Sequence, residues 1–518
     1  MRFRPFTRYA LIFILSAGWG ALFLPWNGFM DPDAFYHAKA SMLLWAHGPL
    51  RSFPWLDLTL LGRSFADLHF GFHAFVAPFT AAFGMFQGLR IASVCLVGLF
   101  AAVFYASLLR LRIRFPMLWT ALLLASPALL FRLVLGKATP LALTLFVAGI
   151  AAASLRRPRI LAGISIVFAL CYAGWIYLFG SVVLLASGDA LYALCMQDGP
   201  IWKRLRALRW QEPLAVLIGG LAGMCVHPNF PGIFTLWWAQ VVTIGLGTPY
   251  AHVNLGSEWL PSTFTGFMSA YALWMIIGLV GSAGLLFAPR KPLDESRARL
   301  VISLGVVLAG LFALTVKSQR NTEYLGPVVV LWCAALWSLV AARRLRAEME
   351  KAFAGYGRIG SMLVKCVLGL CVLAVLGKGL MRGWQDLHPA RYADDTYART
   401  ASAISARATP GDRVFHTSWD EFPFLFATDD RLRYVSGLDP TFLYVTQPAL
   451  SDELKDVTFG AVTTTREQAW ALIHDELHSR FVFATVQNHA PFISVIRSDP
   501  RYTLLAQDAQ SIAWEVAP

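Results

Sequence analysis

The sequence predicts a polytopic α-helical membrane protein that ends in an α/β soluble domain. Of its 518 residues, 57% are hydrophobic and only 14% are charged, whereas soluble proteins carry about 25% charged residues. A chain of this length cannot bury so much apolar surface in one core, because cores stop growing near about 250–300 residues. The composition therefore excludes a cytosolic enzyme, a secreted disulfide scaffold and a disordered chain.

A second observation is the distribution of charge. The chain holds 44 Lys and Arg against 31 Asp and Glu, a formal net charge of +13. The basic residues form short runs between apolar stretches, which is typical of cytoplasmic loops and argues against nucleic acid as the partner. The seven cysteines fall in apolar stretches without CxxC or Cys/His spacing, so we expect no structural disulfide.

The apolar segments have lengths that suit a bilayer. The first, residues 9–25, follows Arg2, Arg4 and Arg8 and has no small-residue cleavage site after it, so we expect an uncleaved span with a cytoplasmic N-terminus. Ten further segments are near the length of about 20 residues that a spanning helix requires. They are 89–110, 116–134, 139–154, 159–176, 178–196, 213–226, 264–288, 299–316, 324–342 and 361–381.

These eleven spans put the basic clusters on one face, the N-terminal one, as the positive-inside rule requires. The clusters lie at 110–114, 156–159, 203–209, 290–299 and 343–346. Counting residues 69–84 as a further span would move every later basic cluster to the opposite side of the membrane. We therefore expect that segment, and likewise 231–247, to be an external interfacial or re-entrant helix.

The third observation is a change to polar composition after residue 382. It predicts a transmembrane domain over 1–382, with a long first external loop over 26–88, and a second domain over 383–518. An odd number of spans places the second domain on the periplasmic or external side. Its helix and strand signals alternate, which favours an α/β fold. The signals are helical patterns at 391–407 and 466–477 and strand-like runs at 412–417, 480–486 and 502–516.

Charged residues collect first in the loop that follows the opening span. Asp31 and Asp33 lie on either side of a proline, and two carboxylates so placed could ligate a divalent cation. One of them could instead serve as a general base beside His37 and Lys39. The alternative is a solvated loop with a helix start at Asp33. Three other histidines have no metal-ligand spacing and are expected to be structural: His47, His69 and His73.

Further candidates lie at the external ends of later spans. Arg132 and Lys137 close the third span and could hold an anionic phosphate, or they could be side chains that snorkel to the interface. Glu258 is a candidate second carboxylate or a helix-start acid. Arg320, followed by Tyr324, could bind phosphate through two hydrogen bonds or pair with a neighbouring glutamate.

The run Asp31-Pro32-Asp33-Ala34-Phe35-Tyr36-His37 resembles the first-loop motif of the GT-C superfamily of membrane glycosyltransferases. It is most similar to the catalytic subunits of bacterial and archaeal oligosaccharyltransferases. The expected interfacial helix, the glutamate at 258 and the α/β tail are similar too. Trp419-Asp420, within 417–422, resembles the W-W-D-Y-G signature of that family.

The resemblance implies transfer of a sugar from a polyprenyl-phosphate or polyprenyl-pyrophosphate donor at the external face of a bacterial inner membrane. The acceptor would be a glycan, a lipid or a protein. Asp33 would match the family's essential first-loop acid and Glu258 the glutamate of the second external element. Asp31 would join them if Mg²⁺ or Mn²⁺ is bound. Where those enzymes carry a second acidic pair this chain has Lys137, which favours a metal-independent route in which lysine or arginine neutralises phosphate.

The expected roles follow from displacement at an anomeric carbon, which needs a base and positive charge on the leaving phosphate. Asp33 is the expected base or metal ligand, and Glu258 orients the acceptor or ion. The expected substrate and phosphate contacts are His37, Lys39, Arg132, Lys137, Arg320 and Tyr324, with Trp419 and Asp420 on the acceptor side.

Two alternatives remain at this point. The chain could be an oligosaccharyltransferase that moves a whole lipid-linked glycan. It could also be a non-enzymatic transporter or flippase of lipid-linked sugars, which should show inverted repeats and broken helices in matching halves.

Overall fold

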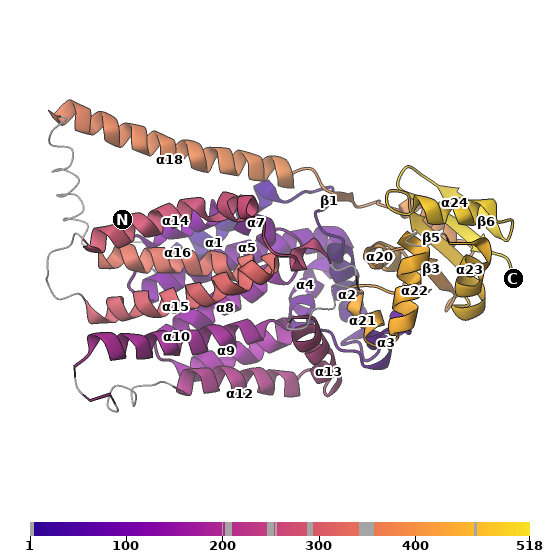
Figure 1. The fold of residues 1–518 in the computed structure, drawn as a ribbon, viewed down its shortest axis with the longest axis horizontal. Helices are drawn as coiled ribbons and strands as arrows, with labels where there is room; N and C mark the ends of the chain where they lie inside the picture. The colour runs from indigo at the N-terminus through magenta and orange to yellow at the C-terminus, as the bar shows by residue number, and fades with distance from the viewer. Residues whose placement is uncertain are drawn as a thin grey trace.

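The protein is a helical bundle with an α/β domain at one end (Figure 1). The computed structural model describes residues 5–198, 200–201, 210–245, 253, 256–286, 294–340, 357–459 and 464–518. The bundle is formed by the apolar segments and the domain by the polar tail, so the change of composition along the chain corresponds to two structural layers.

Each of the eleven apolar segments is helical over most of its described residues. The helices are α1 (Pro5–Phe23), α5 (Met85–Arg110), α6 (Pro116–Leu124) with α7 (Pro127–Leu133), α8 (Thr139–Ser154), α9 (Pro158–Cys171), α10 (Trp175–Met196), α12 (Gln211–Cys225), α14 (Phe264–Leu286), α15 (Glu295–Lys317), α16 (Thr322–Leu339) and α18 (Gly357–Leu387). The last of these helices, α18, diverges from the bundle along most of its length and approaches it near α7 and α1 (Figure 1).

Six helical segments among the described residues are long and apolar enough to cross a membrane, and the bent pair α6–α7 makes a seventh. This makes the chain an integral membrane protein. The expected number of eleven spans is not confirmed by length. Helices α8, α9 and α12 have only 16, 14 and 15 residues, which is about 21–24 Å at 1.5 Å per residue, short of the hydrocarbon thickness of about 30 Å.

The span expected over 116–134 is broken into two helices. The chain bends there by 76° between α6 and α7, and Pro127 begins the second helix. Proline lacks the N–H that continues a helical hydrogen-bond ladder, and it disfavours helical geometry in the residue before it. The bend turns the end of α7 towards the external loops.

Two of the basic clusters meet at one end of the bundle. The backbone N–H of Arg114 donates to the Ser338 hydroxyl at 2.9 Å, and the guanidinium of Arg297 donates to the Ser338 carbonyl at 3.0 Å. Figure 1 places the N-terminus at this end, opposite the α/β domain. The expected clusters at 203–209, 290–291 and 343–346 lie outside the described residues.

The first loop folds into short helices between α1 and α5. They are α2 (Asp33–His47), η1 (Pro54–Leu56), α3 (Leu60–Arg63) and α4 (Phe70–Phe83). Helix α4 packs on α2 and α5 through fully buried Phe72 and Val76. The other segment expected at the interface forms α13 (Gly232–Trp238) and the π-helix η2 (Ala239–Ile244). The position of both segments relative to the bilayer stays a prediction.

The tail is an α/β domain, as expected. Its five-stranded sheet has the order β4-β3-β5-β7-β6, with β3 parallel to β4 and β5, and β7 antiparallel to β5 and β6. The predicted elements are α19 (Ala398–Ser405), β3 (Arg413–His416), α23 (Arg466–Trp470) with η7 (Ala471–Glu476), β5 (Phe481–Thr485), β6 (Tyr502–Gln507) and β7 (Ser511–Val516). Elements that the sequence did not predict are η6 (Trp419–Glu421), α20 (Phe422–Thr428), β4 (Arg433–Tyr434), α21 (Thr441–Tyr444), α22 (Pro448–Phe459) and α24 (Ala490–Ser498).

The domain is attached to the first loop as well as to the last helix. Strand β1 (Gly28–Phe29) pairs antiparallel with β2 (Tyr392–Ala393). Asp57 of the loop accepts hydrogen bonds from Arg413 at 2.7 Å and Arg433 at 3.3 Å. The boundary expected at residue 382 falls inside α18, which continues to Leu387. Loop and domain therefore form one packed layer at this end of the bundle.

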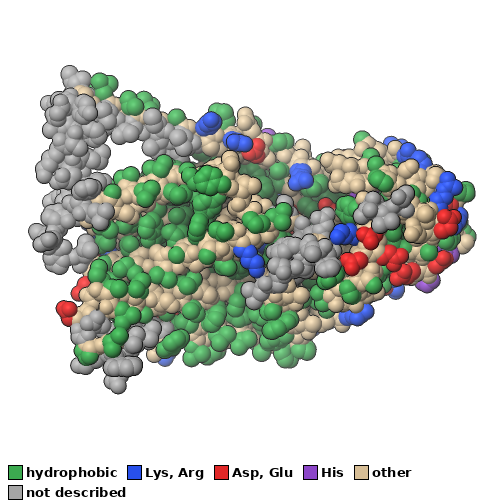
Figure 2. Space-filling model, viewed as in Figure 1, with side chains coloured by type: hydrophobic (Ala, Val, Ile, Leu, Met, Phe, Trp, Pro, Cys, Tyr) green, Lys and Arg blue, Asp and Glu red, His purple; other side chains and the backbone are tan. Residues whose placement is uncertain are grey.

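The surface agrees with this division. Figure 2 shows hydrophobic side chains over the flanks of the bundle, whereas Lys, Arg, Asp and Glu gather on the α/β domain. Extended apolar flanks of this kind are expected where lipid, and not water, covers the protein.

The β1–β2 ribbon makes a first prediction. A Cβ at Gly28 would collide with the backbone carbonyl of Tyr392, which cannot move without displacing the strand, whereas a Cβ at Gly18 would meet nothing within 4 Å. Gly28→Ala should lower the free energy of unfolding by about 1–3 kcal/mol. Thermal unfolding of the full-length protein in detergent measures this, with Gly18→Ala as the control. Equal melting temperatures for the two variants would contradict the importance of the ribbon.

Candidate functional site

A cavity of about 700 Å³ lies where the loops at one end of the bundle meet the α/β domain. Its lining comes from five places: α2 and the residues before it, the loop between α7 and α8, the turn η4 (Ser257–Trp259), the turn η5 (Gln319–Asn321) and the domain. Segments more than 400 residues apart along the sequence therefore contribute to one site.

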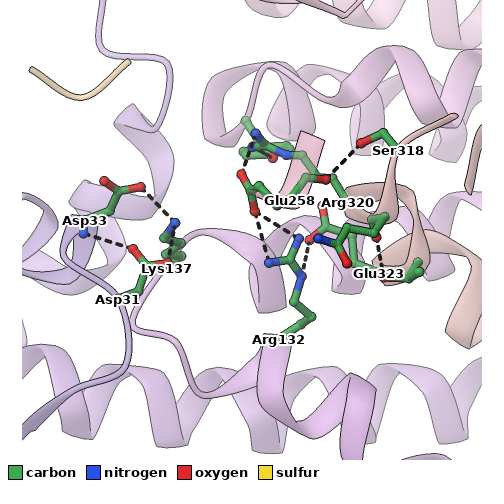
Figure 3. Close-up of polar contacts among 11 residues, drawn as sticks. Asp31, Asp33, Arg132, Lys137, Glu258, Ser318, Arg320 and Glu323 are labelled. Carbon is green, nitrogen blue, oxygen red and sulfur yellow. Dashed lines mark hydrogen bonds and ion pairs between the residues drawn. The ribbon is translucent and has the colours of Figure 1, made fainter. Parts of the chain in front are cut away.

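Two carboxylates enclose one ammonium group on the first-loop side of the cavity (Figure 3). Helix α2 begins at Asp33, whose backbone N–H donates to Asp31 Oδ1 at 3.0 Å, and this turn holds both acids on the same side. Lys137 Nζ lies 2.8 Å from Asp31 Oδ2 and 2.8 Å from Asp33 Oδ2. Gly136 permits the approach of the lysine, because its φ is +73° and a Cβ there would press on Ala34 at 3.2 Å.

The surroundings shift the pKa values of the lysine and of Asp33 in this group. Although burial favours the neutral amine, Asp31 and Asp33 raise the pKa of Lys137, so the lysine stays charged. Burial raises the pKa of Asp33 to about 6, although Lys137 opposes the shift. Asp33 Oδ1 is buried and has no hydrogen-bond partner among the described residues. An unpaired buried oxygen is costly, and here it leaves an acceptor for a proton or a hydroxyl group at the cavity.

A second charged cluster lies on the bundle side (Figure 3). Glu258 Oε2 is 3.2 Å from Arg132 Nη1, and Glu258 Oε1 is 3.0 Å from Arg320 Nη1. Arg132 also pairs with Glu323 at 3.3 Å. Although burial opposes it, Arg320, Lys137 and Arg132 lower the pKa of Glu258 below its ordinary value. The glutamate is thus an ionised anchor between two guanidinium groups.

The donor set does not fit the divalent metal that the sequence left open. Mg²⁺ and Mn²⁺ prefer carboxylate oxygens, but Asp31 and Asp33 are engaged by Lys137, and Glu258 by two arginines. In the described part of the chain no group of three His, Cys, Asp or Glu is placed to hold a metal ion. The Lys137 ammonium takes the position that a cation between the aspartates would need.

The structure brings most of the predicted residues together. Asp31, Asp33, His37, Arg132, Lys137, Glu258, Arg320, Trp419 and Asp420 all line the cavity. Their roles stay predictions, but their convergence is observed. The backbone of η4, which carries Glu258, is fixed as well, because the Ser318 hydroxyl donates to the Glu258 carbonyl at 3.0 Å.

Two of the predicted substrate contacts lie elsewhere. Lys39 is buried and pairs with Asp430 of the domain at 3.4 Å. It follows His37 by two residues, which is about 200° around a helix, so the two side chains point to opposite sides. Tyr324 is buried in the bundle, with its ring stacked on Tyr177 at 4.5 Å. Neither residue lines the cavity.

Five further residues that line the cavity belong to none of the sequence motifs described above. They are His69, Tyr172, Arg391, Tyr392 and Asp439. The Tyr172 hydroxyl accepts a hydrogen bond from Arg320 at 2.8 Å. The guanidinium of Arg391 lies over the Tyr392 ring at 5.4 Å and has no carboxylate within ion-pair distance among the described residues. A signal for Arg391 was its place directly after the last apolar segment, but only the β1–β2 pairing brings it to the first loop.

Comparison with known proteins supports the fold. No protein-family model and no curated protein matches the chain. Solved structures do match. The apo oligosaccharyltransferase of Archaeoglobus fulgidus has a TM-score of 0.63 at 11% identity, covering 92% of this chain and 70% of the other. AglB of the same organism, in complex with an inhibitory peptide and a dolichol-phosphate, has 0.59 at 13%, covering 97% and 73%. Mycobacterial arabinofuranosyltransferase AftD has 0.56 at 14%, covering 99% and 42%.

These structures are GT-C glycosyltransferases. The resemblance that the first-loop residues suggest is therefore confirmed at the level of the fold, which extends over nearly the whole chain. At identities of 14% or below, the likeness concerns architecture, and the chemistry of this cavity depends on its own residues.

The lysine between the aspartates generates a second prediction. Lys137→Ala should leave Asp31 and Asp33 facing one another without a cation, and Mn²⁺ should then bind with a Kd of about 10⁻⁴ to 10⁻³ M, as in weak carboxylate sites. Electron paramagnetic resonance of Mn²⁺ added to the full-length protein measures free and bound ion. Lys137→Arg, which keeps the positive charge, and the native chain are the controls. We infer that the Lys137 ammonium occupies the place of a metal ion between the aspartates. Tight Mn²⁺ binding by the native chain, or no Mn²⁺ binding by Lys137→Ala, would contradict it.

Proposed function

We propose that the chain is a membrane glycosyltransferase that transfers a sugar from a polyprenyl-phosphate donor to an acceptor at the external face of a bacterial inner membrane. The observation that carries this proposal is the pairing, in one cavity, of a buried carboxylate oxygen without a partner and a fixed ammonium group beside it. The GT-C fold supports it.

The reaction is a displacement at the anomeric carbon. The oxygen of an acceptor hydroxyl attacks that carbon, and the bond from carbon to the phosphate oxygen breaks, with the electron pair leaving on the phosphate. Asp33 Oδ1 takes the hydroxyl proton, which requires the ionised carboxylate. Lys137 holds the other oxygen of Asp33 at 2.8 Å and so fixes the orientation of the base.

The departing phosphate needs positive charge that is not already neutralised. Lys137 faces two carboxylates, and Arg132 and Arg320 share two glutamates. Arg391 lines the same cavity, lies over the Tyr392 ring and has no ion-pair partner within the described part of the chain. We assign Arg391 to the phosphate and Lys137 mainly to the base, while Arg320 holds Glu258 in place. This division modifies the expected role of Lys137 as a direct phosphate clamp.

A lipid-borne donor suits the position of the cavity. Its walls include apolar side chains of the bundle, among them Phe131, Leu135 and Phe267, so an isoprenoid chain can stay in the bilayer while its head enters a polar space. The match to AglB in complex with a dolichol-phosphate supports this class of donor. Most cations that line the cavity are paired with carboxylates, so little positive charge is free to balance a phosphate group. A monophosphate carries less negative charge than a pyrophosphate, so a single sugar on a monophosphate fits better than a whole glycan on a pyrophosphate.

The assignment of the base leads to a third prediction. Asp33→Asn should lower the rate of sugar transfer by about 100-fold or more, the usual contribution of a general base. The assay uses the full-length protein in lipid nanodiscs with a panel of polyprenyl-phosphate monosaccharides that carry radiolabelled sugar, and membrane extract as the source of acceptor. Asp430→Asn is the matched control, because Asp430 pairs with Lys39 outside the cavity. Equal rates for Asp33→Asn and the native chain would exclude Asp33 as the base.

The pKa of the same carboxyl group leads to a fourth prediction. Because burial raises the pKa of Asp33 to about 6, the protonated, inactive form should accumulate as the pH falls through 6. The rate at saturating donor should therefore fall about tenfold per pH unit below 6 and level off above it. An inflection near the ordinary value of 3.8, or a flat profile between pH 5 and 8, would contradict the buried base.

A further inference from the structure

A chain of hydrogen bonds leads from the cavity into the first loop. His37 lines the cavity, and its Nδ1 lies 2.8 Å from Nε2 of His73. Nδ1 of His73 lies 2.7 Å from Oδ2 of Asp67. The histidines are almost completely buried, with exposed fractions of 3% for His37 and 0% for His73. The sequence analysis had expected His73 to be structural only.

The far end of this chain is held in place by the loop before α13. The Asn229 side chain accepts the backbone N–H of Asp67 at 3.2 Å, and Asp67 Oδ1 accepts the backbone N–H of His69 at 3.0 Å. The Asn229 N–H donates to Nδ1 of His227, so His227 carries its proton on Nε2 and donates it to the Asp67 carbonyl at 3.1 Å. Asp67 therefore cannot turn away from His73.

The positions of the protons follow from this geometry. Although burial opposes it, the hydrogen bonds that Asp67 accepts from His73 and from the backbone N–H of His69 lower its pKa, so its carboxylate is ionised and can only accept. His73 then carries a proton on Nδ1. We take His73 to carry this proton alone, because its Nε2 lies against Nδ1 of His37 and not against a carboxylate. Its Nε2 is then an acceptor, and His37 must donate from Nδ1.

We propose that Asp67 and His73 fix the Nδ1–H tautomer of His37 and so present its bare Nε2 to the cavity, where it accepts a hydrogen bond from a hydroxyl group of the substrate. Nε2 of His37 has no hydrogen-bond partner among the described residues. Asp67 and His73 are positioning residues, since they act through His37.

This inference deepens the proposed function and rests on it for the identity of the ligand. It also changes an expectation. Phosphate oxygens only accept hydrogen bonds, and a bare Nε2 cannot donate one, so His37 is a contact for a hydroxyl group and not for the phosphate. His37 follows Asp33 by four residues, which places both on one face of α2. The hydroxyl belongs either to the donor sugar or to the acceptor.

The tautomer can be measured without any substrate. In the full-length protein labelled with ¹⁵N-histidine, His37 and His73 should each show a protonated Nδ1 and an unprotonated Nε2; signals are assigned by their loss in His37→Phe and His73→Phe. In Asp67→Asn the side-chain amide can donate a hydrogen bond to Nδ1 of His73. The proton of each histidine should then move from Nδ1 to Nε2, just as replacing the aspartate of a catalytic triad by asparagine changes the tautomer of its histidine. His489→Gln, a buried histidine of the α/β domain, is the control that should leave them unchanged. A native His37 protonated on Nε2, or a doubly protonated His73, would overturn the proposal.

Binding measurements separate the two sources of the hydroxyl. His37→Phe keeps the ring, so polyprenyl phosphate without sugar should bind as in the native chain. If the donor sugar supplies the hydroxyl, polyprenyl-phosphate glucose should bind about tenfold more weakly. If the acceptor supplies it, donor binding is unchanged and the KM for the acceptor rises about tenfold. No change in either quantity would overturn the hydroxyl contact. Failure of the native chain to bind polyprenyl phosphate would refute the proposed function instead, while the tautomer measurement still stands.

Discussion

The contact on which the site depends is the ammonium of Lys137 between Asp31 and Asp33. Without it, two partly buried carboxylates would repel one another at the start of α2 with no cation between them. The same contact ties the first loop to the segment between α7 and α8. One lysine thus balances charge, orients the candidate base and joins two parts of the chain.

The second charged cluster serves a different purpose. Arg132, Arg320, Glu258 and Glu323 satisfy one another almost completely, so they form a rigid wall and contribute little net charge. The candidate for direct contact with an anion is Arg391, which arrives with the α/β domain. The domain therefore does more than cover the cavity: it completes its electrostatics.

Much of the fold was predictable from the sequence, because apolar length and the change at residue 382 are local properties of the chain. The convergence of Asp33, Lys137 and Glu258 was predictable through the motif of the first loop. Their partners were not. Nothing local indicates that Lys137 is shared by two aspartates, that Lys39 turns to the opposite side of α2, or that β2 brings Arg391 to the cavity. Such facts depend on tertiary contacts between distant segments.

The β1–β2 ribbon has a consequence for the order in which the molecule is made. Gly28 and its partner Ala393 lie far apart along the polypeptide, so the first loop stays unpaired until the ribosome and translocon have delivered the chain as far as residue 393 of 518. Contacts of such long range form late. A nascent chain that ends before β2 consequently holds its aspartates and lysine without the finished enclosure, and the cavity is complete only when the α/β domain has been made.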